Sequence, residues 1–495
     1  MRSMAYFRVM DETRIYGSAA GWFKWLAARR LVGRSARADK VFAVRHGARG
    51  SAGAPGEPHR AVAGHPVQLR SGQRAPDRWC GENHDAPRTG LSRWHCFFYF
   101  TANSGVAGMT KTTNAQREDL REDLRRILGM PLGRCELAPE SRGAVERDGV
   151  VIEKWIWTSE PGSRVPCALY RPAASAGRMP AVVLTCGHGG SKSQWQYVYA
   201  GQLYAKMGLA CLVLDPIGEE ERHIAGGIGT RAHDPEPVHD CADQAGRLIM
   251  GKLVFDTVRG IDFLESRDDI DAGRIGVAGN SLGGAKATWM LALDTRLKLA
   301  LVSGWAVCDY MTVTGKFCTR VPYQRLRQRC DWPEFLSLAA PHCAVLFLNG
   351  DADTIIDRDG DDTAWVGMRK SVADASAHFA AGHLDCWFAA GGGHRPYHCY
   401  TVSLEWMHRY LGTPGWTLDQ IRSLPTVNSG AWCDQQGIEL EKLYGNQLHQ
   451  RGAALPDLGL ATIPREDLAC LRADECGDPQ YTLEGWLAQI DQPSS

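Results

Sequence analysis

The chain has 495 residues, of which 44% are hydrophobic and 23% are charged, as is usual for soluble globular proteins. These proportions exclude a globally disordered or fibrous chain, and the absence of any run of 18 apolar residues excludes an integral membrane protein. Basic and acidic residues both number 56, so the overall charge does not favour nucleic acid as a partner. The sixteen cysteines form no CxxC pair, which argues against a zinc ribbon or a redox pair and favours a reducing compartment.

The first 108 residues differ in composition from the rest of the chain. They hold 17 basic and 7 acidic side chains and show neither helical nor alternating apolar periodicity. No apolar stretch followed by a small-residue cleavage site marks a secretory signal. We therefore predict that residues 1–108 are a disordered or mis-annotated N-terminal extension, that Met109 is the true start and that the protein is cytoplasmic. Binding of RNA or anionic lipid by the clustered arginines is the alternative.

Beyond Met109 the apolar residues recur at regular spacing. Leucine and isoleucine residues three and four apart predict an amphipathic helix over about 114–128. Two alternating segments joined by a Pro-Gly turn predict antiparallel strands over 150–157 and 164–172.

After residue 178 short apolar strands alternate with helices. The predicted strands are 179–186, 209–215, 274–280, 298–304 and 343–349, and the predicted helices include 196–207, 244–265 and 282–293. Solidly apolar strands that alternate with helices form a parallel sheet covered on both faces. We therefore predict a doubly wound, mostly parallel α/β sheet with antiparallel strands at its N-terminal edge. The domain is expected to span 109–412, with a C-terminal extension, 413–495, packed on it.

A GxSxG motif joins one predicted strand to the next helix. The strand 274–280 runs into Gly279-Asn280-Ser281-Leu282-Gly283 and then into an apolar helical segment. In such a turn the serine has a strained backbone, and glycines on both sides avoid collisions of a Cβ with neighbouring backbone. The helix also directs its free N–H groups and positive dipole end at the serine. We predict Ser281 as a nucleophile; a glycine-rich helix start that only packs closely on the sheet is the alternative.

A serine nucleophile needs a base that a third group orients. The strand 343–349 ends in a loop that contains Asp351, Asp353 and Asp357, at the sheet edge where ligands bind in such folds. Asp353 is the predicted acid, because it stands three positions after the glycine that closes the strand, and this is the usual position of the acid in such loops. Asp351 and Asp357 are expected to be turn-forming or exposed carboxylates.

The predicted base is His394, which follows three glycines in the loop 391–393. A flexible loop at the sheet edge can bring an imidazole over the serine, whereas a helix fixes its histidines in place. His383 also follows a glycine and is the competing candidate. His398 and His408 are expected on the surface of a helix.

Donors for a tetrahedral oxyanion are expected on both sides of the serine. One is the backbone N–H of Leu282, the residue after the nucleophile. The second is expected in the loop Gly187-His188-Gly189-Gly190, with the N–H of His188 preferred over that of Gly189. A tight strand-to-helix turn without a catalytic role is the alternative for this loop. The His188 side chain either touches substrate or forms hydrogen bonds within the loop.

Several motifs in order carry a resemblance to a known family: SEPGSRVPCALYRP, VVLTCGHGGSK, LDPIGEEER, FDTVRGIDFLESRDDIDAGRIGVAGNSLGG and GGGHRPYHCY. Over about 115–412 the chain resembles bacterial α/β-hydrolases of the acetyl xylan esterase-like and dienelactone hydrolase-like type. The resemblance implies the α/β-hydrolase fold and a serine esterase with a triad of Ser281, Asp353 and His394. The chain departs from the family at Glu220, where a glycine is often found, and dienelactone hydrolases proper carry a cysteine nucleophile.

The expected activity is hydrolysis of carboxylic esters, including acetylated saccharides, through an acyl-enzyme. A prolyl-oligopeptidase-type peptidase is the first alternative, although no repeats of a β-propeller precede residue 178. A catalytically silent binding protein of the same fold is the second, although such relatives usually lose a triad residue. No cofactor or metal is expected, because the sixteen histidines show no HExxH or close paired spacing. Expected partners are small-molecule or saccharide esters, without nucleic acid or membrane.

Two insertions are expected to shape the pocket. The first, 218–243, is rich in glycine and proline and contains three histidines, His223, His233 and His239. The second, 305–338, contains five aromatic residues, Trp305, Tyr310, Phe317, Tyr323 and Trp332. These aromatics either stack on sugar rings or pack on one another in a small cap.

Overall fold

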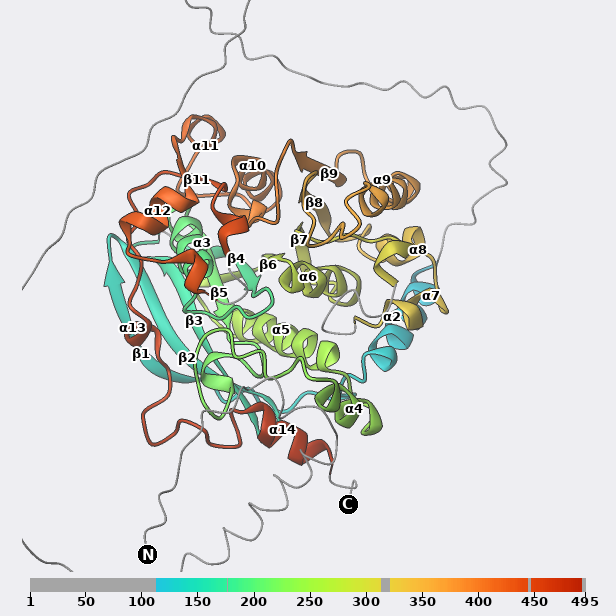
Figure 1. Ribbon diagram of the computed structural model, residues 1–495, viewed down its shortest axis with the longest axis horizontal. Coiled ribbons are helices and arrows are strands. Elements are labelled where there is room, and N and C mark those ends of the chain that lie inside the picture. The colour runs from blue at the N-terminus through green and yellow to red at the C-terminus, as the bar shows by residue number, and fades with distance from the viewer. Residues whose placement is uncertain (1–112, 176, 313–320, 444–446, 492–495) are drawn as a thin grey trace, which may run out of the picture. The chain divides into compact units, whose positions relative to one another are not determined.

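A computed structural model describes residues 113–175, 177–312, 321–443 and 447–491 (Figure 1). The predictions for the extension 1–108 and for Met109 lie outside the described residues. Within the described part of the chain, no helix is both long and apolar enough to cross a bilayer.

The centre of the fold is a nine-stranded sheet with the order β1-β2-β3-β5-β4-β6-β7-β8-β9. β1, β2, β3 and β5 pair antiparallel in that order, and the remaining neighbours pair parallel. The strands are β1 (Glu140–Arg147), β2 (Val150–Glu160), β3 (Ser163–Pro172), β4 (Met179–Thr185), β5 (Ala210–Leu214), β6 (Ile270–Asn280), β7 (Leu297–Ser303), β8 (Ala344–Gly350) and β9 (Leu384–Ala389). The predicted fold class, a doubly wound and mostly parallel sheet with an antiparallel N-terminal edge, is confirmed.

Helices cover both faces of this sheet (Figure 1). One face packs against α2 (Asn114–Ile127), α4 (Glu236–Gln244), α5 (Ile249–Glu265), α6 (Leu282–Leu293), α7 (Tyr323–Arg327), α8 (Trp332–Ser337), α9 (Thr363–Ala375) and α14 (Leu483–Ile490). The other packs against α3 (Trp195–Lys206), α10 (Thr401–Tyr410), α11 (Leu418–Ser423), α12 (Ser429–Gln435) and α13 (Arg465–Leu468).

The central strands are solidly apolar because both of their faces are buried. In β4, Ala181 and Val183 belong to one hydrophobic cluster, whereas Val182 and Leu184 belong to the cluster on the opposite face. Successive side chains of a strand point to opposite faces, so a strand between two helical layers needs apolar residues at every position. This arrangement places the carboxyl ends of β4, β6 and β8 along one edge of the sheet, where the candidate site lies.

The helix predicted over about 244–265 begins later than expected, at Ile249, because a break after Gln244 separates α5 from α4. Gly246 has a φ of +69°, and the Arg247 N–H donates to the Ala242 carbonyl at 2.9 Å. A left-handed glycine with this bond pattern ends a helix. Strand β1 was not predicted, because this edge strand has a largely polar sequence and exposes most of its side chains.

The aromatic residues of the second insertion mainly form a buried cluster. Trp305, Tyr323 and Trp332 are almost fully buried, and Trp305 Nε1 donates to the Tyr323 hydroxyl at 2.7 Å. The Tyr323 and Trp332 rings meet edge to face with centroids 5.0 Å apart. Of the two alternatives, packing of a small cap therefore describes these three residues and sugar stacking does not. Phe317 lies outside the described residues.

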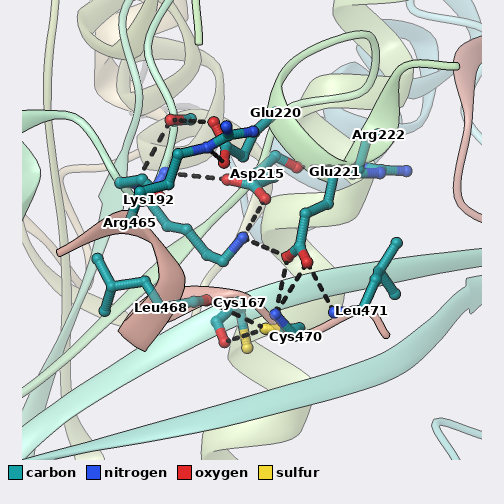
Figure 2. A network of polar contacts seen from close by, with 12 residues as sticks. Cys167, Lys192, Asp215, Glu220, Glu221, Arg222, Arg465, Leu468, Cys470 and Leu471 are labelled. Carbon is teal, nitrogen blue, oxygen red and sulfur yellow. Dashed lines mark hydrogen bonds and ion pairs between the residues drawn. The ribbon is translucent and has the colours of Figure 1, made fainter. Parts of the chain in front are cut away.

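The chain after residue 412 contacts the sheet domain at many points. A short two-stranded sheet forms from β10 (Thr426–Asn428) and β11 (Ala454–Pro456). Glu221 accepts hydrogen bonds from the backbone N–H groups of Cys470 and Leu471, at 2.9 Å and 2.6 Å (Figure 2). Trp195 of α3 donates to Gln447 at 3.2 Å. These contacts bring the segment around 447–450 to the edge of the sheet.

Candidate active site

The candidate nucleophile stands in a strained turn between β6 and α6. Ser281 has φ 61° and ψ −123°, a backbone conformation that residues other than glycine rarely adopt. A Cβ on Gly279 would lie 2.1 Å from Thr185 Oγ1, and one on Gly283 would lie 2.2 Å from the Thr185 carbonyl oxygen. The turn therefore presses α6 against β4 so closely that both glycine positions exclude side chains.

Replacing Gly283 with alanine is expected to lower the free energy of unfolding by about 1–3 kcal/mol, because the new methyl group overlaps the Thr185 carbonyl. Urea denaturation followed by tryptophan fluorescence measures the change. Gly133→Ala is the matched control, since nothing lies within 4 Å of its Cβ position. Equal stability of the two variants would contradict this close approach.

The predicted acid and base contact one another. His394 Nδ1 lies 2.7 Å from Asp353 Oδ2, and both side chains are at least 95% buried. The other carboxylate oxygen, Oδ1, accepts hydrogen bonds from the backbone N–H groups of Ile355 and Ile356, at 2.9 Å and 3.2 Å. The loop after β8 thus fixes the carboxylate, and the carboxylate fixes the orientation of the imidazole.

The loop that carries His394 is held against the carboxyl ends of β7 and β8. The Tyr397 N–H donates to Ser303 Oγ at 3.0 Å, and the Tyr397 hydroxyl donates to the Gly393 carbonyl at 2.5 Å. The Ala352 N–H donates to the Gly392 carbonyl at 2.9 Å. The glycines of this loop therefore allow close packing of the backbone as well as a turn.

Ser281 and His394 line the same open cleft, whose cavity volume is about 180 Å³. Its other lining residues come from the loop after β4, from α3, from the end of β6, from the loop after β8 and from the C-terminal segment: Gly187, His188, Gln196, Asn280, Ile355, Gln447, His449 and Gln450. The three residues from the C-terminal segment were not predicted, because nothing in their local sequence marks them.

The predicted oxyanion donors flank the cleft. Leu282 begins α6, where the first N–H groups of a helix have no acceptor within the helix. The loop 187–190 borders the serine, since a Cβ on Gly187 would lie 3.5 Å from Ser281 Cβ. The His188 side chain reaches the first insertion, where its Nε2 lies 2.5 Å from Asp234 Oδ1.

His383 and His398 do not line the cleft that contains His394. His383 precedes β9, at the amino end of the strand, and packs its ring on Tyr410 with centroids 4.9 Å apart. His383 therefore lies at the opposite edge of the sheet from the cleft. The prediction of a surface position is wrong for His398, which is fully buried in a 3₁₀ turn and lies with Nδ1 3.1 Å from the Tyr204 hydroxyl.

Burial shifts the pKa of three side chains near the oxyanion loop. It lowers the pKa of His233 to about 3 and that of Lys286 to about 8, and it raises the pKa of Glu219 to about 7. His233 is thus neutral near pH 7, while Lys286 and Glu219 titrate close to neutral pH.

Comparison with known proteins relates the domain to esterases. Residues 143–330 match the acetyl xylan esterase (AXE1) family model. The match includes Ser281 and ends before Asp353 and His394. "Putative hydrolase YtaP" of Bacillus subtilis (strain 168) is 26% identical over 196 residues, which cover 37% of this chain and 63% of that protein. The chain therefore matches slightly less than two thirds of the length of this relative.

Solved structures are also similar. A glucuronoyl esterase from Solibacter usitatus is 17% identical, with 57% of this chain and 88% of that chain covered and a TM-score of 0.44. An acetyl xylan esterase from Paenibacillus sp. R4 is 19% identical, with 61% and 97% covered and a TM-score of 0.41. The described domain thus has a doubly wound, mostly parallel α/β sheet, and residues 143–330 of it are similar to the acetyl xylan esterase family.

Proposed function

We propose that the protein is a serine esterase that hydrolyses carboxylic esters through an acyl-enzyme intermediate. The observation that carries the proposal is a cleft lined by strained Ser281 and by His394, whose imidazole pairs with the buried Asp353. The family match of residues 143–330 supports the same reaction class.

In the proposed mechanism, Ser281 Oγ attacks the ester carbonyl while His394 takes its proton. Asp353 accepts a hydrogen bond from His394 Nδ1 and stabilises the imidazolium that forms. The N–H groups of Leu282 and His188 bind the oxyanion. His394 then protonates the leaving alcohol, and a water molecule activated by the same imidazole releases the acid and regenerates the serine. Each step uses only groups of this chain and water.

We propose an ester of a polyhydroxylated alcohol, such as an acetylated saccharide, as the substrate class. Glutamine side chains line the cleft at Gln196, Gln447 and Gln450. The Oε1 atoms of Gln196 and Gln450 are buried and have no hydrogen-bond partner among the described residues. An amide side chain both donates and accepts hydrogen bonds, so glutamines that line a cleft are suited to bind the hydroxyl groups of a sugar. The description of the matching family, acetyl xylan esterase, supports this class.

The reaction is tested by labelling with a fluorophosphonate, which modifies activated serines, and by turnover of p-nitrophenyl acetate. We expect a single labelled peptide that contains Ser281 and ester turnover that stops when the label is bound. Cleavage of a proline anilide without ester turnover would favour the peptidase alternative. Neither labelling nor turnover of either substrate would favour the silent binding protein.

Replacing Gln450 with leucine is expected to raise KM for an acetylated xylo-oligosaccharide about 5- to 10-fold, the effect of losing about one hydrogen bond in the cleft. Steady-state rates with this substrate and with p-nitrophenyl acetate measure the effect. The small phenyl ester serves as the control, because it has no sugar hydroxyl groups and its kcat/KM is expected to change less than about twofold. Equal losses with both substrates would contradict a role in binding the alcohol.

We also propose the cytoplasm as the site of action. The thirteen cysteines in the described residues are free thiols, which is usual for proteins of reducing compartments.

A further inference from the structure

A second group of chemically reactive side chains lies beside the oxyanion loop. His188, His233 and Asp234 bring three ligand atoms within 4.8 Å of one another. His188 Nε2 lies 2.5 Å from Asp234 Oδ1, and His233 Nε2 lies 3.7 Å from the same oxygen. None of the three has a role in the chemistry of the proposed mechanism through its side chain.

The hydrogen bond on the far side of His233 determines which nitrogen faces the cluster. His233 Nδ1 lies 2.7 Å from the Ile217 carbonyl oxygen, and a carbonyl only accepts, so Nδ1 carries the proton. The Nε2 atom of the neutral ring then presents a lone pair. This atom is fully buried, and no hydrogen bond to it forms among the described residues. A buried lone pair thus faces a carboxylate oxygen that is also an acceptor, an arrangement that a cation between them would satisfy.

The distances and the donor set fit a metal ion of the zinc class. Two ligand atoms that are each about 2.0 Å from a tetrahedral ion lie about 3.3 Å apart, and the observed separations of 2.5 Å and 3.7 Å fall on either side of this value. Two imidazoles and one carboxylate are a common ligand set for Zn²⁺. The Nδ1–H bond of His233 to the Ile217 carbonyl is the kind of outer contact that orients a metal-binding histidine.

We propose that His188 Nε2, His233 Nε2 and Asp234 Oδ1 bind a divalent transition-metal ion that ties the oxyanion loop to the first insertion. His188 belongs to the loop 187–190 after β4, whereas His233 and Asp234 belong to the insertion 218–243. The ion therefore cross-links two segments that are 45 residues apart. Its role is to hold the loop in place, and no step of ester hydrolysis passes through it.

One residue of the chain competes with this ion. Arg231 forms an ion pair with Asp234 Oδ2, and its Nε lies 3.3 Å from His188 Nε2. Its side chain is 34% exposed, so it has room to turn toward solvent when a metal binds. Removing the Arg231 charge is therefore expected to tighten metal binding, because like charges repel at this distance.

The test uses the full chain without a polyhistidine tag, freed of metals with EDTA. Titration with CoCl₂ and with ZnCl₂, followed by calorimetry and by the visible absorption of tetrahedral Co²⁺, is expected to show one bound ion per chain. Mg²⁺ is expected to bind much more weakly, because it prefers oxygen ligands. Bound Zn²⁺ is also expected to raise the thermal unfolding midpoint.

Variants separate this site from adventitious binding and from a folding defect. His233→Ala and the isosteric Asp234→Asn are expected to weaken Co²⁺ binding at least 10-fold, and Arg231→Gln is expected to strengthen it. His223→Ala is the matched control, since His223 lies in the same insertion and contacts Glu484 instead, at 3.3 Å. Ser281→Ala is expected to bind the ion like the wild type, which separates this proposal from the proposed function. Equal Co²⁺ uptake by the wild type, His233→Ala and Asp234→Asn, or no uptake by the wild type, would overturn the proposal.

Discussion

Replacing Ser281 with alanine is expected to lower kcat/KM for an acetyl ester by at least about 10³-fold, because the acyl-enzyme then has no oxygen on which to form. The remaining rate comes from binding and from the oxyanion donors, which do not require the hydroxyl. Initial rates with p-nitrophenyl acetate, measured at equal concentrations of folded protein, give the comparison. Folding is expected to stay intact, since the exchange removes one oxygen atom at the edge of an open cleft.

Variants of two histidines provide the matched comparison. His394→Ala is expected to lose as much activity as Ser281→Ala, and the double variant is expected to lose little more, because the serine and the base act as a unit. His383→Ala is expected to keep wild-type activity, since this histidine precedes β9 at the opposite edge of the sheet. Retention of more than about a tenth of the activity by Ser281→Ala would rule out the serine mechanism.

The parts of the site that local sequence predicts are those that sit at the ends of strands. Ser281 follows β6 directly, and the loop with Asp353 follows β8. In a parallel sheet the carboxyl ends of such strands meet at one edge, so a local motif also gives a place in three dimensions. The glycine loop with His394 likewise follows β9, at the same edge of the sheet.

The contribution of the C-terminal segment has no such local signal. Gln447 and Gln450 lie in a single 3₁₀ turn, and they reach the cleft only because distant contacts position this turn. One of these contacts is the hydrogen bond from Trp195 to Gln447 across 252 positions of the chain. Periodicity describes what one segment does by itself, and it carries no information on such long-range packing.

The cluster of His188, His233 and Asp234 was missed for the same physical reason. Motif searches for metal ligands detect histidines a few positions apart on one helix or hairpin. Here one histidine comes from the loop after β4 and the other from an insertion 45 residues later, and the fold brings their rings to a centroid distance of 5.8 Å. The prediction that His398 lies on a helix surface was wrong for another reason. This residue lies in a buried 3₁₀ turn that precedes the helix α10.

Replacing Lys192 with methionine is expected to lower the free energy of unfolding by about 3–5 kcal/mol, because it leaves two buried carboxylates without their cation. Lys192 Nζ lies 2.5 Å from both Asp215 Oδ2 and Glu221 Oε2, and the lysine side chain is fully buried (Figure 2). Burial by itself lowers the pKa of the Lys192 ammonium, but these two carboxylates hold it well above its usual value. Urea denaturation followed by tryptophan fluorescence measures the loss.

The same substitution is expected to loosen the C-terminal segment before the sheet unfolds. Glu221 accepts the N–H groups of Cys470 and Leu471, so a carboxylate that turns toward water to regain solvation releases this backbone. Limited proteolysis is therefore expected to cut near residue 470 faster in Lys192→Met than in the wild type. The triple variant Lys192→Met/Asp215→Asn/Glu221→Gln is the control, because it removes all three charges and keeps the acceptors. It is expected to recover most of the lost stability, since a buried ion network replaced as a whole costs far less than one left unbalanced. A loss below about 1 kcal/mol in Lys192→Met, or an equal loss in the triple variant, would mean that packing rather than charge balance stabilises this contact.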